Sequence, residues 1–216
     1  MLPSVSTEAP QGISPAATFA SEVTNDLGAV LSPSQARTFL DCAYKWYAKH
    51  ALGLPDPPNG SFVRGRVVHK MAELYYRARL AGKTPDLDDM HQPFEEAWDR
   101  EAAMAAFGAD ENVDELKRQA AVLTRKYLEE VAPEIQPAAV ERPVTGTIGG
   151  VCVRAFIDLV DTRGRIIDLK TAAKSPSGVS ADYAFQVATY RQLAPQASGL
   201  ARLDTLVANK TPKIVT

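Results

Sequence analysis

The chain has 216 residues, of which 45% are hydrophobic and 23% are charged, and its formal net charge is -2. A chain of this length and composition can bury one sizeable core, which excludes a wholly disordered or fibrous protein. The slightly negative net charge excludes a positive electrostatic potential over the whole protein, so any contact with nucleic acid needs local clusters of Lys and Arg.

The two cysteines and the N-terminal segment bear on the compartment. Cys42 and Cys152 lie far apart, without the paired spacing of metal ligands. They predict neither a disulfide framework nor a zinc or iron-sulfur site, so a reducing, cytoplasmic location is the default. Residues 1–30 have no basic start and no continuous apolar stretch, so they resemble neither a signal peptide nor a membrane span. We expect a mostly disordered leader there and no contact with a membrane.

Helical periodicity dominates the next hundred residues. Apolar side chains recur there at close to 3.6 residues, and Ser32 or Ser34 can cap the first helix. The second helix ends at Gly82, and the last two are rich in Ala and alternating charge. We expect the region 31–135 to form a helical wall. The predicted helices cover residues 34–51, 62–82, 86–106 and 111–131.

After Pro137 the period of the apolar residues falls to two, and Val, Ile and Thr replace Ala and Glu. This change predicts three strands that form an antiparallel meander. Ser180 can then cap a helix, which a fourth strand follows. The predicted strands cover residues 138–147, 150–160, 164–171 and 202–209, and the helix covers 181–194.

The hairpin between the second and third strands fixes the positions of two carboxylates. A three-residue turn that ends at Gly164 makes Asp161 face Arg165. Continuing this pairing places Asp158 opposite Asp168, with Lys170 on the same face. A two-residue turn would instead put Asp168 on the core face. The other face is predicted to be core, and it carries Val151, Val153, Ala155, Ile157, Leu159, Ile167 and Leu169.

Two carboxylates that face each other repel unless a positive charge lies between them. A divalent cation meets that need, and oxygen ligands without cysteine favour Mg²⁺ or Mn²⁺ over zinc. Lys170 could position an attacking water or stabilise charge on a phosphate oxygen. A surface salt bridge among Asp158, Asp168 and Lys170 fits these residues equally well.

Four segments in the right order make the chain similar to a known family. "FIDLVD" with "GRIIDLKTA" resembles the catalytic hairpin of the PD-(D/E)XK nuclease superfamily, in its RecB-like exonuclease branch. "LSPSQARTFLDCAYKWYAKHALGL" resembles the opening helix of that branch. "GRVVHKMAE" resembles its Gly-x-x-x-His helix, and "QVATY" its Gln-x-x-x-Tyr helix. The resemblance covers residues 31 to about 208.

The resemblance implies a fold. It is an α/β, restriction-endonuclease-like core, a mixed sheet with the antiparallel hairpin meander flanked by helices, beside an N-terminal helical region. We expect one nuclease domain over 31–216, with the catalytic core at 136–216. Relatives usually continue with more sheet or helix where this chain stops, which leaves open a truncation at the C-terminus.

The resemblance also implies roles for site residues. His69 would be a metal ligand on a helix, beside Asp158 and Asp168, although a lone helical His is more often structural. The carbonyl of Leu169 would be an extra ligand. Lys170 would act as the catalytic base or as an electrostatic helper.

Four further residues have weaker assignments. The resemblance implies that Gln186 and Tyr190, one helical turn apart, support the site or contact the nucleic-acid backbone. Glu73 lies one turn after His69 and could orient its imidazole or a metal-bound water, or belong to a solvated helix face. Glu141 is a candidate for one more carboxylate, on a face that the sequence does not fix.

The implied function is a divalent-metal-dependent DNA nuclease, most simply an exonuclease, in DNA repair, recombination or phage DNA processing. Cys42 lies where iron-sulfur members place their first ligand, but the later three cysteines are missing, so we expect no cluster. No Gly-x-x-x-x-Gly-Lys-Ser/Thr loop occurs, so a helicase or recombination motor would be a partner. The alternative is a non-cleaving DNA-binding or recombination-complex subunit that keeps the fold.

DNA is expected to approach through basic clusters, and a channel under the helical wall is expected to admit a single-stranded end. The channel would be lined by Arg66, Lys70 and Arg77. The clusters comprise Arg64, Arg66, Lys70 and Arg77 on one side, and Lys174 and Arg191 on the other.

Overall fold

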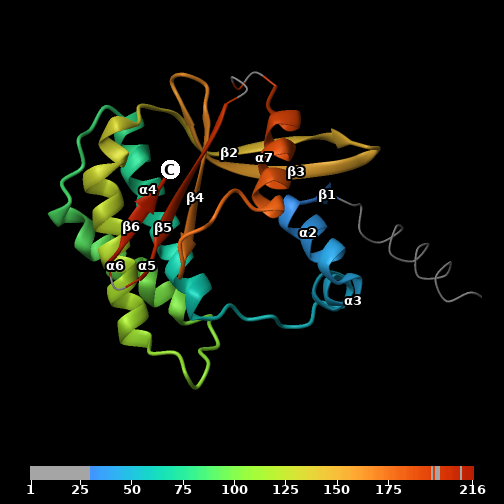
Figure 1. Cartoon of the computed structure of the whole chain (residues 1–216), viewed down its shortest axis with the longest axis horizontal. Helices are drawn as coiled ribbons and strands as arrows, with labels where there is room; N and C mark the ends of the chain where they lie inside the picture. Colours follow the sequence, from blue (N-terminus) through green and yellow to red (C-terminus); the bar gives the residue numbers. More distant parts are fainter. Residues whose placement is uncertain (1–29, 196, 198–199, 210) are drawn as a thin grey trace, which may run out of the picture.

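A computed structural model describes residues 30–195, 197, 200–209 and 211–216 (Figure 1). The predicted leader, 1–30, lies outside the described residues except for its last position. Among the described residues, no helix combines the length and apolar composition needed to span a bilayer. The helices are α2 (Pro33–Asp41), α3 (Ala43–Trp46), α4 (Gly60–Leu80), α5 (His91–Ala102), α6 (Val113–Glu130) and α7 (Ala181–Leu193). The strands are β1 (Val30–Leu31), β2 (Pro137–Ile148), β3 (Val151–Asp161), β4 (Ile166–Ala172), β5 (Ala201–Val207) and β6 (Lys213–Val215).

The six strands form one mixed sheet. β2, β3 and β4 make the predicted antiparallel meander, and β4 pairs in parallel with β5 after the crossover through α7. The short β1 pairs in parallel with β3, and β6 runs antiparallel to β5. Helices α4, α5 and α6 gather beside one face, while α7 lies over β2 and β3 (Figure 1). The predicted α/β class, with helices flanking the sheet and a helical N-terminal region, is confirmed.

Helix α4 is the centre of the helical wall. The Asn59 side chain caps it by accepting the N–H of Phe62, so the helix begins at Gly60, two residues before the predicted start. One side of α4 packs on the sheet, where Tyr75 lies in the same core as Leu169. The other side packs on α5 and α6, with Met71 fully buried. Each such side chain contributes about 1.5–3 kcal/mol of transfer free energy.

The prediction of a single helix over 34–51 is wrong. Ser32 caps α2 as expected, but the helix ends at Asp41, and Cys42 is extended with φ of -160°. The Cys42 sulfur then accepts the N–H of Lys45 and caps α3, which a π-helical turn follows. The break lets Trp46 become buried while the preceding apolar side chains stay exposed, so packing overrides the helical pattern here.

The predicted register of the β3–β4 hairpin is confirmed. Leu159 pairs with Ile167 and Val160 pairs with Ile166, and Gly164 has the left-handed φ of 74° that the turn requires.

The prediction of one apolar core face along the hairpin is wrong. Ala155 and Ile157 belong to the core under α7, whereas Leu159 belongs to the core under α4. The alternation of side chains between the two faces of β3 therefore changes at Asp158. At the facing position on β2, Glu141 has a left-handed φ of 47°, and the ladder is interrupted between the pairs on either side. Val151, at the start of β3, is exposed.

Strands β3 and β4 separate directly after their two ladder pairs. Beyond that point β1 pairs with β3 only at residues 152–153. Over residues 154–158, no described strand pairs with the β3 edge that faces β4. We call this opening between β3 and β4 the fork.

Candidate active site

Asp158 lies at the base of the fork. Its Oδ2 accepts the backbone N–H of Leu169 at 3.0 Å, a bond that holds the side chain where the two strands part. His69 of α4 reaches the same oxygen, with Nδ1 at 3.4 Å. The structure thus brings together the predicted helical ligand and the first predicted carboxylate.

Asp168 is buried beside Lys170. Only 1% of Asp168 is exposed, and its Oδ2 lies 2.9 Å from Lys170 Nζ. Its Oδ1 is buried and has no hydrogen-bond partner among the described residues. Burial, and then the charge of Asp158, raises the pKa of Asp168 to about 6, although Lys170 opposes the shift. This carboxylate has one oxygen free for another positive group.

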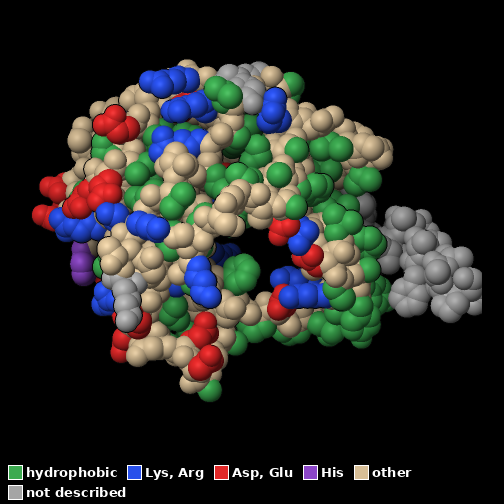
Figure 2. Space-filling model, in the orientation of Figure 1, with side chains coloured by type: hydrophobic (Ala, Val, Ile, Leu, Met, Phe, Trp, Pro, Cys, Tyr) green, Lys and Arg blue, Asp and Glu red, His purple; other side chains and the backbone are tan. Residues whose placement is uncertain are grey.

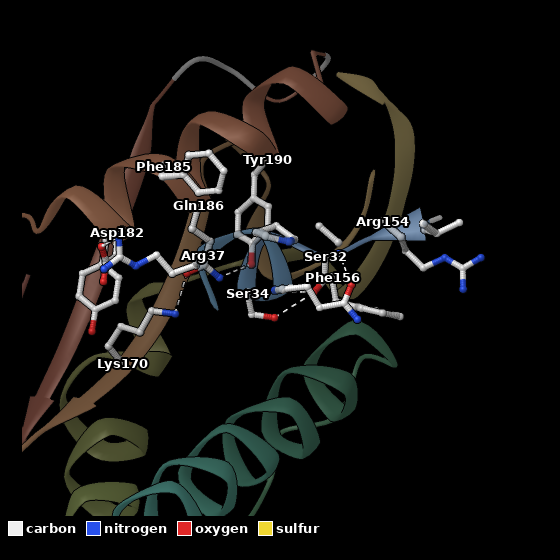
Figure 3. Close-up of a pocket in the computed structure, with 15 residues that line it drawn as sticks. Ser32, Ser34, Arg37, Arg154, Phe156, Lys170, Asp182, Phe185, Gln186 and Tyr190 are labelled. Carbon is white, nitrogen blue, oxygen red and sulfur yellow. Dashed lines mark hydrogen bonds and ion pairs between the residues drawn. The ribbon is translucent and has the colours of Figure 1, made fainter. Parts of the chain in front are cut away.

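A chain of polar contacts fixes Lys170. Its Nζ donates to Gln186 Oε1 at 3.1 Å, and Gln186 Nε2 donates to the hydroxyl of Tyr190 (Figure 3). The ammonium also lies 5.2 Å from the ring centre of Tyr183. The predicted Gln-x-x-x-Tyr pair therefore supports the lysine. Tyr183 was missed, although its position three residues before Gln186 puts it on the same helix face.

Gly65 explains the Gly-x-x-x-His spacing on α4. A Cβ at this position would lie 3.0 Å from Thr171 Oγ1 on β4. The missing side chain lets α4 approach β4 closely, and His69 one turn later then reaches Asp158.

The two glutamates of uncertain role have separate environments. Glu141 faces a small cavity that it shares with His69 and Asp158. Burial, and then the charges of Asp158 and Glu73, raises the pKa of Glu141 to about 7. Burial alone would raise the pKa of Glu73, but hydrogen bonds from Lys70 and Arg77, at 2.9 and 2.7 Å, lower it. Glu73 therefore binds two cations rather than facing solvent.

The possible ligand atoms of His69, Asp158 and Asp168 are of the kind that binds a divalent ion, but they do not form a complete metal site. Within the described residues, no three His, Cys, Asp or Glu side chains lie close enough together to hold a metal. Asp158 and Asp168 nevertheless offer hard oxygen donors, and the Asp168 Oδ1 is an orphaned buried acceptor of the kind a cation satisfies. The Leu169 side chain is core, and a metal role for its carbonyl stays a prediction.

Comparison with known proteins now settles the family. The model of the PD-(D/E)XK nuclease superfamily matches residues 30–210. The chain belongs to this superfamily. None of the curated protein sequences compared with it matches.

The fold agrees with this family. The crystal structure of a protein named "Putative exonuclease" from Eubacterium rectale is similar at 14% identity, with a TM-score of 0.55, over 94% of this chain and 76% of that one. The fork is therefore in a restriction-endonuclease-like fold, as predicted. The Asp168-Leu169-Lys170 run has the Asp-x-Lys form that appears in the name of the superfamily, whose members typically use divalent metals. The RecB-like branch stays a prediction.

Two cavities of this nuclease-family fold meet at Lys170. One, of about 780 Å³, runs along α4 past His69 and Glu141, and the other, of about 560 Å³, lies in the fork. Lys170 and Tyr183 line both. Figure 2 shows the molecule hollowed at its centre, between the α4 region and the α2–α3 segment.

The predicted basic clusters are only partly available to DNA. Arg64 was placed wrongly, because it is buried and donates to Gln119 of α6 at 2.7 Å. Arg66 is paired with Glu101 at 3.0 Å, and Lys70 and Arg77 share Glu73. The three cations of the predicted channel are thus paired with two carboxylates, which leaves one positive charge unmatched. Lys174 and Arg191 are exposed, as predicted.

Proposed function

We propose that this chain is a divalent-metal-dependent DNA nuclease that hydrolyses phosphodiester bonds as an exonuclease on a single-stranded end. The main support is the placement of Lys170, which lies 2.9 Å from Asp168 and 3.1 Å from Gln186 at the junction of two cavities. A lysine held in this way presents a fixed positive charge to whatever occupies the cavities.

The residues that would hold the metal are His69, Asp158 and Asp168, with the Leu169 carbonyl as an extra ligand, and the three side chains would have to move closer together around the ion. When bound, the ion would polarise a phosphoryl oxygen and lower the pKa of a bound water. Asp168 can offer Oδ1 while its Oδ2 keeps Lys170 in place. The Leu169 N–H fixes the Asp158 carboxylate at the base of the fork, where it shares a small cavity with His69.

Lys170 has two predicted roles, and its contacts favour the electrostatic one. The Lys170 ammonium donates to a buried carboxylate and to an amide oxygen, so its charge is held in a fixed position. Its charge is then ready to stabilise negative charge that develops on a phosphate oxygen. Gln186 and Tyr190 act through the lysine as positioning residues.

End-labelled single-stranded and duplex DNA, incubated with Mg²⁺, Mn²⁺ or EDTA, tests this function. We expect shortening of the strand with either metal and none in EDTA. Closed circular single-stranded DNA should resist, while the same molecule linearised is degraded. Equal degradation of both would show an endonuclease. DNA binding without cleavage in any metal would identify the non-cleaving subunit instead.

A further inference from the structure

The cavity in the fork contains aromatic surface that the protein itself does not cover. Phe156 of β3 is 53% exposed and Phe185 of α7 is 41% exposed, and both line this cavity of about 560 Å³. Among the described residues, neither ring packs against another aromatic ring. Figure 3 shows the two rings on different sides, with Arg37, Gln186 and Tyr190 between them. They are placed to contact two different groups of one ligand.

A cation without a matching charge lies at the edge of the cavity (Figure 3). Arg154 of β3 lines it and is exposed, and no described carboxylate lies within 4 Å of its guanidinium. Arg37 differs, because it pairs with Asp41 at 2.7 Å and with Asp182 at 2.9 Å. Arg154 therefore remains available for an anionic ligand, whereas Arg37 is shared by two carboxylates.

The position of the cavity identifies the ligand. Lys170 lines both this cavity and the one that runs past His69, so a chain that crosses the site at Lys170 enters the fork. Such a chain must offer flat apolar groups to the phenylalanines and an anionic backbone to Arg154. A single strand of nucleic acid has both features, and a duplex hides the faces of its bases.

We propose that the fork is a subsite for unpaired bases next to the scissile phosphate, in which Phe156 and Phe185 each stack on a base and Arg154 contacts a phosphate. The identity of the strand rests on the proposed nuclease function. Stacking of one base on an aromatic side chain contributes about 1–3 kcal/mol, so either phenylalanine should change affinity measurably.

Binding of labelled oligothymidine, measured by fluorescence anisotropy in EDTA, tests the subsite without cleavage. Phe156→Ala and Phe185→Ala should each weaken binding about tenfold and should not weaken duplex binding. Tyr44→Ala is the matched control, because Tyr44 is 79% exposed on α3 and lines neither cavity. Arg154→Gln should weaken binding at low salt more than at high salt. It should also lower the slope of log affinity against log salt concentration by the amount expected for about one phosphate contact.

Oligomers with one abasic position, moved along the strand, separate stacking from general damage. The wild type should lose affinity when the abasic position replaces a base that stacks on a phenylalanine. At the position that stacks on Phe156, the Phe156→Ala variant should bind the abasic strand as well as the intact one, because the base and the ring act as a pair. The subsite would be overturned if both phenylalanine variants bound single strands as tightly as the wild type does. It would also be overturned if the variants lost the same affinity for strands with and without bases. Metal-dependent cleavage with unchanged binding contradicts the subsite alone. Base-dependent binding without cleavage in Mg²⁺ or Mn²⁺ contradicts the proposed function alone.

Discussion

Glu141 of β2 lies opposite Asp158 of β3, at a position where the ladder between the two strands is interrupted. The pairs on either side are Val140 with Leu159 and Arg142 with Ile157. Glu141 there adopts a left-handed φ of 47°, which costs a non-glycine residue about 1 kcal/mol or more. The interruption changes the face of β3 at Asp158, so local backbone strain accompanies the placement of the carboxylate.

The raised pKa of Glu141 predicts a pH-dependent stability. A folded-state pKa of about 7 against an ordinary 4.5 means that the folded protein binds the proton more tightly than the unfolded chain. The contribution of protonated Glu141 to the stability of the fold is therefore fully present below about pH 4.5, and it is lost as the pH rises through 7. Glu141→Gln should match the wild type at low pH and exceed it by about 2 kcal/mol near pH 8, allowing for solvent screening. Urea unfolding in EDTA measures this, with exposed Glu134→Gln as control.

Asp168→Asn should lower cleavage about a hundredfold or more, because it removes a proposed metal ligand and the partner of Lys170. The fold should be no less stable in EDTA, since the change removes a buried charge that faces a second carboxylate. Melting temperature and cleavage rate are compared with those of exposed Asp89→Asn. Wild-type turnover in Asp168→Asn would remove this residue from the mechanism.

His69→Ala should weaken metal affinity and reduce the rate at low metal concentration. Excess Mn²⁺ should recover part of the rate, because the carboxylates still offer oxygen donors. Calorimetric titration with Mn²⁺ gives the affinity, and His91→Ala is the control, since His91 is exposed on α5. Unchanged affinity and rate would make His69 a structural residue.

Gly65→Ala tests the close approach of α4 to β4. The new methyl group meets Thr171 Oγ1 at 3.0 Å and should push the helix away from Asp158, which lowers the rate about tenfold. Stability should change little, because alanine favours the helix by about 1 kcal/mol. Adding Thr171→Ala removes the contacting oxygen and should restore the rate. A double variant no faster than Gly65→Ala contradicts this explanation.

The register of the catalytic hairpin could be predicted because local rules determine it. Gly164 marks the turn, and the period of two then fixes the pairs up to Leu159 and Ile167, the residues next to Asp158 and Asp168. The resemblance supplied His69, Gln186 and Tyr190, and the structure brings these side chains to the two carboxylates and Lys170.

The failures of prediction have non-local causes. Arg64 is buried by Gln119, which lies 55 positions away in the sequence, so no local pattern marks it. The break at Cys42 depends on the burial of Trp46. The change of face at Asp158 coincides with a left-handed glutamate on the neighbouring strand, a conformation that the residue type does not signal.

We propose that the fork holds a metal-dependent nuclease centre in which Lys170 stabilises charge on the phosphate. The single-turnover rate of strand cleavage in Mg²⁺ tests this for the wild type, Lys170→Met and the exposed control Lys83→Met. We expect metal-dependent cleavage that Lys170→Met lowers about 10²–10³-fold, while Lys83→Met stays within about twofold of the wild type. Equal rates for all three proteins, or cleavage that persists in EDTA, would contradict this role of Lys170 and the metal.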